Sequence, residues 1–519
     1  MKYLILIIFM MFNTGLNSQT PQIKWWFDTF DSSYGQSAAG DIDNDGKDEI
    51  VFGCYRNDSN VYALNAEDGS LLWKYNTSDI QEGCNDAAPL IFDVDNDGRL
   101  DVVVASSCNP FTYCFDGLTG AVKWKTDSRG SDSPPTVADI DGDGQNEILH
   151  GEMGGYILCL NAMDGSVKWE LLVDPNSWVQ TAPTIVDLDG DGMLDFLAGT
   201  WSFNENSKLY AYKGIDNSLL WSIELKGLVY HGTAASDIDN DGKMDLMLGD
   251  YNGTLWAVNA ADGSVKWTFK SATYIGSPVV TGDLDDDGFC DIVFTSASKV
   301  YALKYDGNIL WQYDIPNFKQ SFRGAALSDI DNDGLPDVIF GTQGGLLISL
   351  KGTNGSEISR VDLETHYGDV FSIDHAPVIA DFDNDGILDA FVVGGHTDYP
   401  DFSTNYGRGY AVSLGIGKGP EWKMFQYDIH RTGSICGIPS DVRKTLEIDN
   451  INVRMDNKSG RLFITGNKLL NQIYIYDLKG SILGITNPQN ENCDIKLSQY
   501  TSGVYIIKIG EKSYKIMKE

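Results

Sequence analysis

The sequence predicts an all-β protein in which an eight-bladed β-propeller is followed by a small C-terminal β-sandwich. Two observations lead to this fold class. An aspartate-rich loop of the form D-x-D-x-D-G-x-x-[D/E] recurs eight times between Asp41 and Asp389, at intervals of 46 to 52 residues. Short strand-like segments fill each interval, and a repeat of this size is the length of one four-stranded propeller blade.

The two ends of the chain frame these repeats. Residues 4–12 form an unbroken apolar run that follows a lysine and precedes a small polar stretch, which is typical of a secretory signal peptide over residues 1–18. We expect the propeller over residues 19–434, a linker over 435–444 and the C-terminal domain over 445–519. No later segment reaches about 18 continuous apolar residues, so no transmembrane segment is expected.

The fifth repeat shows the order of strands expected in each blade. A short inner strand over 233–236 precedes the aspartate loop, and three more strands are expected over 246–249, 255–259 and 265–269. A turn over 260–263 separates the last two strands.

A tryptophan marks the fourth strand of seven repeats, and Ser359 replaces it in the seventh repeat. We expect these indoles to pack between neighbouring blades, because large aromatic side chains dominate such interfaces. Two segments compete to complete the last blade and close the ring, namely 24–28 and 421–425. The seven tryptophans are Trp73, Trp124, Trp169, Trp221, Trp267, Trp311 and Trp422.

After the repeats, the C-terminal region changes character. Alternating apolar segments over 461–465, 472–477, 494–497 and 503–509 predict the strands of the β-sandwich.

The net charge restricts the partners of the protein. A formal charge of −36 argues against nucleic acid or an anionic membrane, because both require a basic face. Apolar residues make up 42% of the chain, which is enough for a folded core. Each loop holds four acidic residues at positions 1, 3, 5 and 9, so these positions hold 8 × 4 = 32 of the 74 acidic residues, and the charge is concentrated where a cation would bind.

The aspartate loops have the composition of a calcium site. Ca²⁺ takes six to eight oxygen ligands, and carboxylates at positions 1, 3 and 5 converge only where the chain curls tightly. A glycine at position 6 of all eight loops permits that turn. Position 7 varies widely, as expected of a residue that contributes only its backbone carbonyl, and position 9 is acidic. Mg²⁺ is disfavoured because it prefers octahedral sites that keep several waters.

We therefore predict up to eight structural Ca²⁺ ions, held by positions 1, 3, 5, 7 and 9 of each loop. The ligands expected in the first four loops are Asp41, Asp43, Asp45, Lys47, Glu49, Asp93, Asp95, Asp97, Arg99, Asp101, Asp139, Asp141, Asp143, Gln145, Glu147, Asp187, Asp189, Asp191, Met193 and Asp195. Those expected in the last four loops are Asp237, Asp239, Asp241, Lys243, Asp245, Asp283, Asp285, Asp287, Phe289, Asp291, Asp329, Asp331, Asp333, Leu335, Asp337, Asp381, Asp383, Asp385, Ile387 and Asp389.

The aspartate loops resemble the FG-GAP repeats of the integrin-α type, also called VCBS repeats. The strand–turn–Trp segments, such as 61–73, resemble the tryptophan-docking repeats of pyrroloquinoline-quinone-type propellers. Residues 445–519, and above all 473–480 and 502–508, resemble the type A C-terminal sorting domain of the type IX secretion system in Bacteroidetes. This resemblance implies transit across the outer membrane by the type IX secretion machinery, removal of the sorting domain, and an extracellular or cell-surface location.

The function expected from these features is a monomeric binding or adhesion module without enzymatic activity. Its ligand, a glycan or a protein, is expected on the ring face opposite the aspartate loops, because the loops before the inner strands expose aromatic, amide and acidic groups there. The long segment 395–407 should project from the same face. We call this surface the ligand face. Its candidate residues are Tyr34, Gln36, Asp86, Asp132, Trp178, Gln180, His231, Tyr274, Arg323, Asp374, His375 and His396.

An enzymatic alternative is a polysaccharide lyase. Lyases related to rhamnogalacturonan lyase resemble this architecture, and His231, Arg323 and His375 could then serve as base and charge neutraliser. A quinone dehydrogenase is less favoured, because those enzymes show a vicinal cysteine pair that this chain lacks.

Four cysteines fall in loops predicted on one face of the first two blades. In an exported protein they predict one or two disulfides, for which Cys54–Cys84 with Cys108–Cys114 is one arrangement, and the spacing leaves the connectivity open. Two others, Cys159 and Cys290, lie in or beside predicted strands and are expected to be buried thiols.

Overall fold

The computed structural model describes residues 20–203 and 207–436, together with seven strands between residues 452 and 518. The chain divides into two compact units, Met1–Val442 and Arg443–Glu519. The predicted signal peptide and most of the predicted linker lie outside the described residues. Within the described part, no helix has the length and apolar character needed to cross a membrane.

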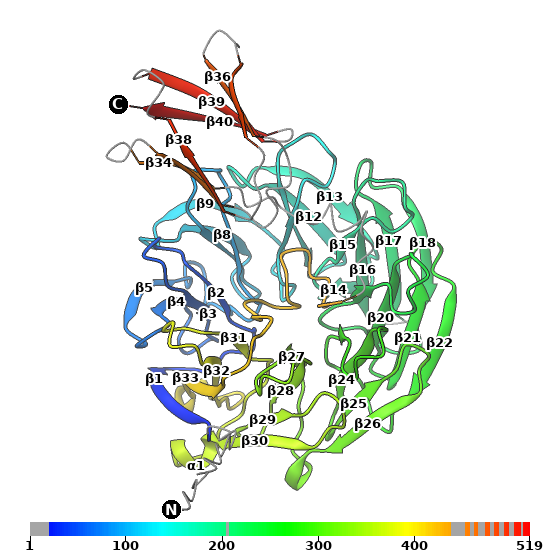
Figure 1. Cartoon of the computed structure of the whole chain (residues 1–519). Helices are drawn as coiled ribbons and strands as arrows, with labels where there is room; N and C mark the ends of the chain where they lie inside the picture. Colours follow the sequence, from blue (N-terminus) through cyan, green and yellow to red (C-terminus); the bar gives the residue numbers. More distant parts are fainter. Residues whose placement is uncertain are drawn as a thin grey trace, which may run out of the picture. The chain divides into compact units, whose positions relative to one another are not determined.

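The first unit is an eight-bladed β-propeller, as predicted (Figure 1). Blades 1 to 4 consist of β2 (Ala38–Gly40), β3 (Glu49–Gly53), β4 (Asn60–Asn65) and β5 (Leu71–Asn76); β6 (Leu90–Phe92), β7 (Asp101–Ala105), β8 (Phe111–Asp116) and β9 (Val122–Asp127); β10 (Thr136–Ala138), β11 (Glu147–Glu152), β12 (Tyr156–Asn161) and β13 (Val167–Leu172); and β14 (Ser177–Val179), β15 (Ile185–Val186), β16 (Asp195–Ser202), β17 (Lys208–Lys213) and β18 (Leu219–Glu224).

Blades 5 to 8 repeat the same antiparallel order. They consist of β19 (Ala234–Ser236), β20 (Asp245–Gly249), β21 (Thr254–Asn259) and β22 (Val265–Lys270); β23 (Val280–Gly282), β24 (Asp291–Ser296), β25 (Lys299–Leu303) and β26 (Ile309–Asp314); β27 (Ala325–Ser328), β28 (Asp337–Gly341), β29 (Leu346–Leu350) and β30 (Glu357–Asp362); and β31 (Val378–Ala380), β32 (Leu388–His396), β33 (Tyr406–Gly415) and β1 (Gln22–Thr29). A five-residue helix, α1 (Leu363–Tyr367), and two short 3₁₀ turns, Pro316–Phe318 and Phe402–Thr404, interrupt the sheet pattern.

The ring is closed by the N-terminal strand. β1 pairs with β33 in antiparallel register, with Trp26 opposite Tyr410, and so supplies the fourth strand of blade 8 (Figure 1). Of the two segments that the sequence left in competition, 24–28 therefore completes the last blade. Joining both ends of the propeller chain in one blade removes the exposed sheet edges that an open ring would leave.

The strand tryptophans join neighbouring blades, as predicted. Trp25 of β1 donates its indole N–H to the carbonyl of Ala66 in blade 1 at 2.8 Å, and its ring covers Gly69 in the same turn. A Cβ atom at Gly69 would lie 2.4 Å from the indole, so only glycine fits beneath it. The same bond to a carbonyl in the next blade is made by Trp73, Trp124, Trp221, Trp267 and Trp311 at 2.6 to 3.0 Å.

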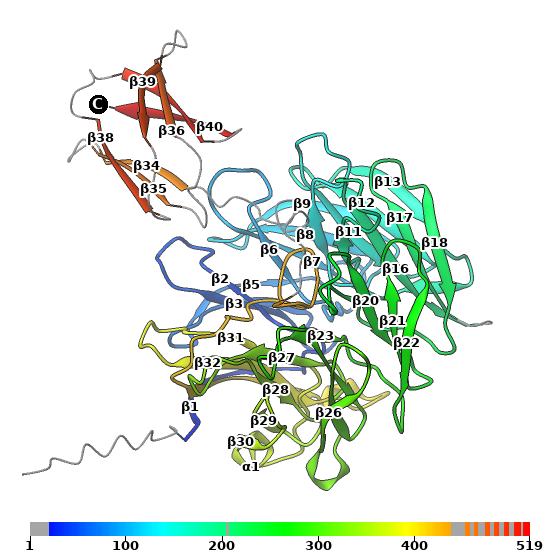
Figure 2. The same ribbon diagram turned by 45° about the vertical axis from the view of Figure 1, so that its right-hand side comes forward.

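The segment after β33 does not form a blade strand. Residues 417–436, which we call the central belt, run inside the ring in both views (Figure 1, Figure 2). Backbone hydrogen bonds of 2.7 to 3.2 Å join this belt to the inner strands in ring order. The donors are Asp329, Ile379, Ala39, Val137, Ile185, Ala235 and Thr281, from blades 7, 8, 1, 3, 4, 5 and 6, and the acceptors are Gly419, Trp422, Lys423, Ile429, His430, Thr432 and Gly433.

The central belt also carries the most deeply buried cation of the described propeller. Arg431 is fully buried and donates to the carbonyls of Pro135, Phe425 and Pro89, so it also reaches blade 2. The assignment of Trp422 to the tryptophan series of the blades was wrong. Its indole lies in the belt, and Trp25 takes the corresponding place in blade 8 because β1 and not residues 421–425 completes that sheet.

The disulfides differ from the arrangement considered above. Cys84 bonds to Cys108, and Cys290 bonds to Cys436 of the central belt. Cys54 and Cys114 are buried thiols, because both side chains point into the packed layers between blades. The expectation of a free thiol was wrong for Cys290, whose partner is 146 residues away and reaches it only through the belt. Cys159 is a buried thiol, as expected.

The second unit contains two antiparallel sheets. One has the strand order β34 (Asn452–Asp456), β35 (Arg461–Thr465) and β38 (Asn492–Lys496), and the other has the order β37 (Ile482–Thr486), β36 (Ile473–Asp477), β39 (Gly503–Ile509) and β40 (Lys512–Lys518). Two such sheets are what a small β-sandwich requires. The sequence prediction located four of these strands and missed β34, β37 and β40.

Candidate functional site

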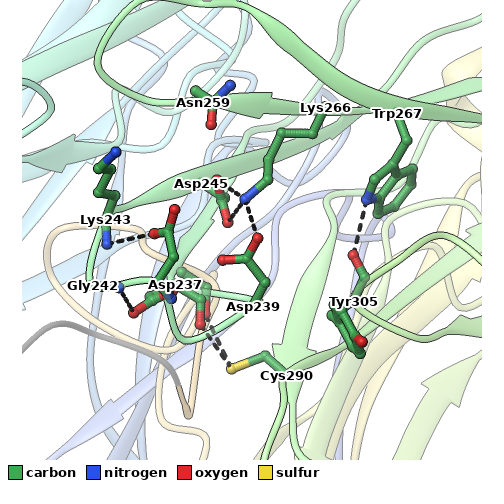
Figure 3. A network of polar contacts seen from close by, with 12 residues as sticks. Asp237, Asp239, Gly242, Lys243, Asp245, Asn259, Lys266, Trp267, Cys290 and Tyr305 are labelled. Carbon is green, nitrogen blue, oxygen red and sulfur yellow. Dashed lines mark hydrogen bonds and ion pairs between the residues drawn. The ribbon is translucent and has the colours of Figure 1, made fainter.

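Each aspartate loop, numbered here after its blade, is curled by its own carboxylates. In loop 5, Asp237 accepts from the backbone N–H groups of Asp241 at 3.0 Å and Gly242 at 2.9 Å, and Asp241 accepts from that of Lys243 at 2.9 Å (Figure 3). These bonds draw positions 1 and 5 together at the mouth of the loop. The backbone also turns left-handed at position 4, for example at Asn240 with φ of 58°.

Position 4 is a requirement that our sequence analysis missed. Every loop has Asn, Gly or Asp there, the residue types that tolerate a left-handed backbone. The signal was present in the sequence as a restricted residue choice between two ligand positions. The eight residues are Asn44, Asn96, Gly142, Gly190, Asn240, Asp286, Asn332 and Asn384.

The curled loops bring carboxylate oxygens close enough to share one ion. In loop 5, oxygens of Asp237, Asp239 and Asp241 lie within 4.8 Å of one another. Loops 1 to 4 hold equivalent groups, formed by Asp41, Asp43 and Asp45; Asp93, Asp95 and Asp101; Asp139, Asp141 and Glu147; and Asp187, Asp189 and Asp195.

Several of these oxygens are buried and have no hydrogen-bond donor. Asp389 at position 9 of loop 8 is fully buried, and its Oδ1 has no partner. A buried carboxylate oxygen without a partner is costly, and a cation is the group that would satisfy it. The donor set therefore fits a hard divalent cation. Further orphaned oxygens belong to Asp95, Asp139, Asp239, Asp283, Asp285, Asp331 and Asp383.

A lysine contacts the carboxylates at the ligand positions of seven of the eight loops, whereas in loop 1 Lys423 contacts only Asp48, at position 8. In loop 5, Lys266 Nζ lies 2.6 Å from Asp239 and 2.9 Å from Asp245, so it joins positions 3 and 9 (Figure 3). Lysines directly before a docked tryptophan all contact these two positions, and they are Lys24, Lys123, Lys168 and Lys266. Lysines at the end of the third strand contact positions 3 and 5 instead, and they are Lys213, Lys304 and Lys351.

Burial raises the pKa of the position 9 carboxyls, and the lysines oppose this effect. The pKa of Asp245, which Lys266 contacts, is raised to about 6. The pKa values of Asp195 and Asp291, which no lysine contacts directly, are raised to about 7. Burial raises the pKa of Glu49 in loop 1 to about 8, and the carboxylates of Asp43 and Asp41 add to the shift.

On the ligand face, Arg323 is the centre of a cluster. Its guanidinium reaches from blade 7 across the ring, where it donates to the carbonyls of Tyr34 and Asp86 and, at 3.2 Å, to the hydroxyl of Tyr230. It also lies 5.6 Å and 5.5 Å from the ring centroids of Tyr34 and Tyr230. Arg323 therefore joins loops that precede the inner strands of blades 1, 2, 5 and 7.

Acidic and amide groups surround this arginine. Gln180 donates to Asp132 at 2.7 Å, and Gln343 donates to Asp374 at 2.8 Å. Burial raises the pKa of Asp86 to about 7, and the neighbouring carboxylate of Asp132 adds to the shift. Asp132 Oδ1 and Arg323 Nε are buried without a partner, so the cluster retains polar atoms that a ligand or water can bind.

Aromatic rings form the other half of the cluster. Trp201 contacts Tyr230 edge to face at 5.5 Å and Tyr251 at 5.1 Å. Tyr251 stacks on Tyr274 at 5.3 Å, and Phe322 lies 6.4 Å from Tyr251. Of these residues only Tyr274 was singled out from the sequence. Tyr230, neighbouring His231, and Phe322, neighbouring Arg323, could have been found by widening the same search by one residue.

The predicted histidines have different environments. His375 is buried, and both its ring nitrogens lie 2.9 Å from backbone carbonyl oxygens, so neither is free for a substrate. The proposed role of His375 as a base is therefore wrong. His231 is also buried, but its Nε2 has no partner, and burial together with Arg323 lowers its pKa well below the usual range.

The remaining predicted residues lie around this centre. Gln36 donates to the carbonyl of Pro377, and Trp178 packs against Phe203 at 4.9 Å. His396 Nε2 lies 3.2 Å from Asp398 Oδ2, on the long segment 395–407. These contacts are local, and none of them joins the Arg323 cluster.

Comparisons with known proteins agree with the two units. A model described as FG-GAP-like repeat matches residues 41–104, 93–150 and 139–198. A propeller model described as outer membrane protein assembly factor BamB matches residues 206–398, and a secretion system C-terminal sorting domain matches residues 448–519. No curated protein matches the sequence significantly.

Solved structures with the same ring are distant in sequence. Sqt1 of Saccharomyces cerevisiae is 12% identical, with a TM-score of 0.54 over 76% of this chain and 100% of that chain. A quinohemoprotein alcohol dehydrogenase of Comamonas testosteroni is 11% identical, with a TM-score of 0.51 over 85% of this chain and 80% of that chain. Likeness at this level shows the propeller fold alone.

The sorting domain indicates secretion through the type IX system to the extracellular space or the cell surface. The aspartate loops are the repeated motif of the propeller, and the docked tryptophans join its neighbouring blades. The chain therefore combines an eight-bladed β-propeller, which matches the FG-GAP-like repeat model over residues 41–198, with a C-terminal sorting domain of the type IX secretion system.

Proposed function

We propose that this protein is an exported, calcium-bearing module that binds a glycan at the Arg323 cluster of its ligand face. The observation that carries the proposal is the meeting of Arg323 with Tyr34 and Tyr230 at the centre of the ring, beside acidic groups on one side and aromatic rings on the other. Aromatic rings stack on sugar faces, while carboxylates and amides bond sugar hydroxyls.

The central belt supports this choice of face. The backbone donors that bond the belt lie either at the first residue of an aspartate loop or two residues before it. The belt side chains of Trp422, Phe425 and Arg431 are buried. The end of the ring near the aspartate loops is thus occupied by the chain itself. A ligand would meet the polar and aromatic groups from the opposite end.

The charge of the cluster favours a neutral glycan over an anionic one. Three carboxyl groups, those of Asp86, Asp132 and Asp374, face the single guanidinium of Arg323. Three of its five N–H groups already bond protein oxygens, and Nε has no partner. An acidic sugar would therefore meet more repulsion than attraction.

Calcium in the aspartate loops has a structural role in this proposal. The loops join each inner strand to the next strand of its blade, and their carboxylates converge without enough donors to satisfy them. Bound Ca²⁺ would neutralise this charge and hold both strands in place. The loops therefore serve the rigidity of the ring, and the Arg323 cluster serves recognition.

A glycan array probed with the purified propeller tests the binding function, followed by calorimetric titration of the best ligands. Trp201→Ala should weaken binding at least about tenfold, since a stacked aromatic contributes on the order of 1.5 kcal/mol. Trp26→Ala is the matched control, because Trp26 is exposed on the outer strand β1. Binding to neutral glycans that is insensitive to Trp201 would place the site elsewhere, and capture of proteins alone would contradict a glycan ligand.

A polysaccharide lyase is the second candidate, favoured by the unpartnered Nε2 of neutral His231 close to Arg323. A neutral imidazole can accept the proton that β-elimination removes from a uronate. Incubation with pectic polysaccharides would distinguish the two functions. Unsaturated products that disappear in a His231→Ala variant would identify a lyase, whereas binding without product would identify a binding module.

A further inference from the structure

Each lysine that enters an aspartate loop comes from one of two places in its blade. Where the residue before the fourth-strand tryptophan is lysine, the third-strand residue paired with loop position 9 is Asp, Asn or Ser, as with Lys266 and Asn259 in blade 5. Where the lysine stands at the end of the third strand, as Lys213 does in blade 4, the residue before the tryptophan is Leu220. No blade uses both positions, so blades 2 to 8 carry one such lysine each.

Blade 1 has a lysine at neither position. Asn65 ends its third strand, and Leu72 precedes Trp73. The nearest lysine, Lys47, bonds to Glu67 outside the loop at 2.7 Å. Lys423 of the central belt lies 2.6 Å from Asp48, which is at position 8 and outside the ligand positions. Within the described residues, no cationic side chain forms an ion pair with Asp41, Asp43, Asp45 or Glu49.

The carboxylates of loop 1 are nevertheless as close together as those of the other loops. Glu49 is 1% exposed, and its Oε2 accepts from the backbone N–H groups of Ile42 and Asp43 at 2.9 and 3.3 Å. No donor in the described part of the chain meets its other oxygen. Loop 1 therefore brings together four carboxyl groups that no lysine of its own blade contacts.

We propose that loop 1 is the high-affinity calcium site of the ring, and that the seven lysines are built-in counter-ions that weaken calcium binding in the other loops. This inference rests on the calcium assignment proposed above. In loops 2 to 8, an incoming Ca²⁺ meets an ammonium group that already bonds the position 3 carboxylate. Repulsion between a divalent ion and an ammonium about 4 Å away is worth at least about tenfold in affinity even in a watery surrounding.

Loop 1 lies next to the seam where β1 closes the ring, so its calcium affinity would affect ring closure. The backbone N–H of Ala66 donates to Asp48 of loop 1 at 3.1 Å, and the carbonyl of Ala66 accepts the indole N–H of Trp25. Trp25 lies in β1, the strand that closes the ring. Calcium in loop 1 would thus strengthen the seam between blades 8 and 1, where the two ends of the propeller chain meet.

Calorimetric titration of the calcium-free full chain with CaCl₂ tests the proposal. We expect one tight site and a class of weaker sites, separated by at least about tenfold in affinity. Leu72→Lys places a lysine before Trp73, as in blade 5, and should abolish the tight site. Lys266→Leu should create a second tight site. Lys270→Leu is the control, because it removes the same charge from the same strand, β22, without contacting loop 5.

The outcomes are distinct. Equal affinity at all sites, or a tight site that survives in a folded Leu72→Lys variant, overturns the role of the lysines but leaves calcium binding intact. If Leu72→Lys does not fold, the Lys266→Leu variant decides by itself. The absence of a second tight site in that variant would contradict the proposal. If no variant binds calcium at all, the calcium assignment is wrong.

Discussion

At the scale of single residues, the centre of the ligand face depends on an uneven balance of charge. Arg323 alone faces Asp86, Asp132 and Asp374, and burial raises the pKa of Asp86 to about 7. Because an unfolded aspartate titrates near 3.9, the folded state binds more protons between these values. The stability associated with Asp86 is therefore fully present below about pH 4 and is lost as the pH rises through about 7.

Replacing this carboxyl with an amide tests the assignment. Asp86→Asn should be more stable than the wild type at about pH 8, with a smaller difference at about pH 5, because only the wild type must ionise a buried group. Thermal unfolding at both values measures the difference. A difference that does not change with pH would contradict the raised pKa.

The docked tryptophans are the residue-scale contacts between blades. Trp221 is almost fully buried, donates to Ala260 of the next blade at 2.7 Å and covers Gly263. Trp221→Ala should lower the free energy of unfolding by about 3–5 kcal/mol through lost contact and a cavity. Chemical denaturation measures this loss, and Trp26→Ala at an exposed position should cost less than about 1 kcal/mol. Equal losses would show that the indole does not join the blades.

At the scale of elements, the central belt has a role that its composition did not reveal. It is too irregular to form a blade strand, yet its carbonyls accept N–H groups that the inner strands would otherwise leave unpaired toward the channel. The disulfide from Cys436 to Cys290 joins the end of the belt to loop 6. The belt therefore couples blades that make no direct contact with one another.

Arg431 is the side chain through which this coupling can be tested. Arg431→Met leaves the carbonyls of Pro135 and Phe425 without their buried donors and should destabilise the propeller by about 2–4 kcal/mol. Urea unfolding followed by tryptophan fluorescence measures the loss. Arg360→Met is the control, since Arg360 is 42% exposed on the outer strand β30 and its ion pair with Glu357 should be worth less than about 1 kcal/mol. Similar losses in both variants would argue against a role of the belt in stability.

At the scale of the whole molecule, the proposed calcium ions would link the net charge to ring closure. The chain carries a net charge of −36, and the loops hold much of it on one face. Self-repulsion of this size destabilises a compact state unless cations offset it. The seven lysines offset part of the loop charge within the fold, and eight bound Ca²⁺ would change the net charge from −36 to −36 + 16 = −20.

Removal of calcium should therefore lower the melting temperature. With Ca²⁺ at ~1 mM and a Kd of ~0.1 mM, each independent site adds about 1.4 kcal/mol, and several sites together approach the total stability of a domain. Scanning calorimetry with and without EDTA measures the shift, and excess CaCl₂ should restore the original value. An unchanged melting temperature in EDTA would rule out a structural role for the ion.

The sequence by itself determined the features that repeat. The aspartate loops, the blade strands and the tryptophans Trp73 to Trp311 recur at similar spacing, because each blade forms the same local structure from the same types of residue. The sorting domain was recognisable for a similar reason, through strands such as 473–477 and 503–509. The lysine of blades 2 to 8 was also visible in the sequence, at one of two positions. That both positions lead to the same aspartate loop became clear only once the third and fourth strands were placed side by side.

Only the tertiary structure decided what occurs once and joins distant parts of the chain. Arg323 meets Tyr34 across 289 residues, Cys290 meets Cys436 across 146, and β1 displaces residues 421–425 from the last blade. No periodic pattern encodes such contacts, because each depends on how the closed ring brings unlike loops together at its axis. The repeats therefore determined the ring, and ring closure determined the candidate ligand site at its centre.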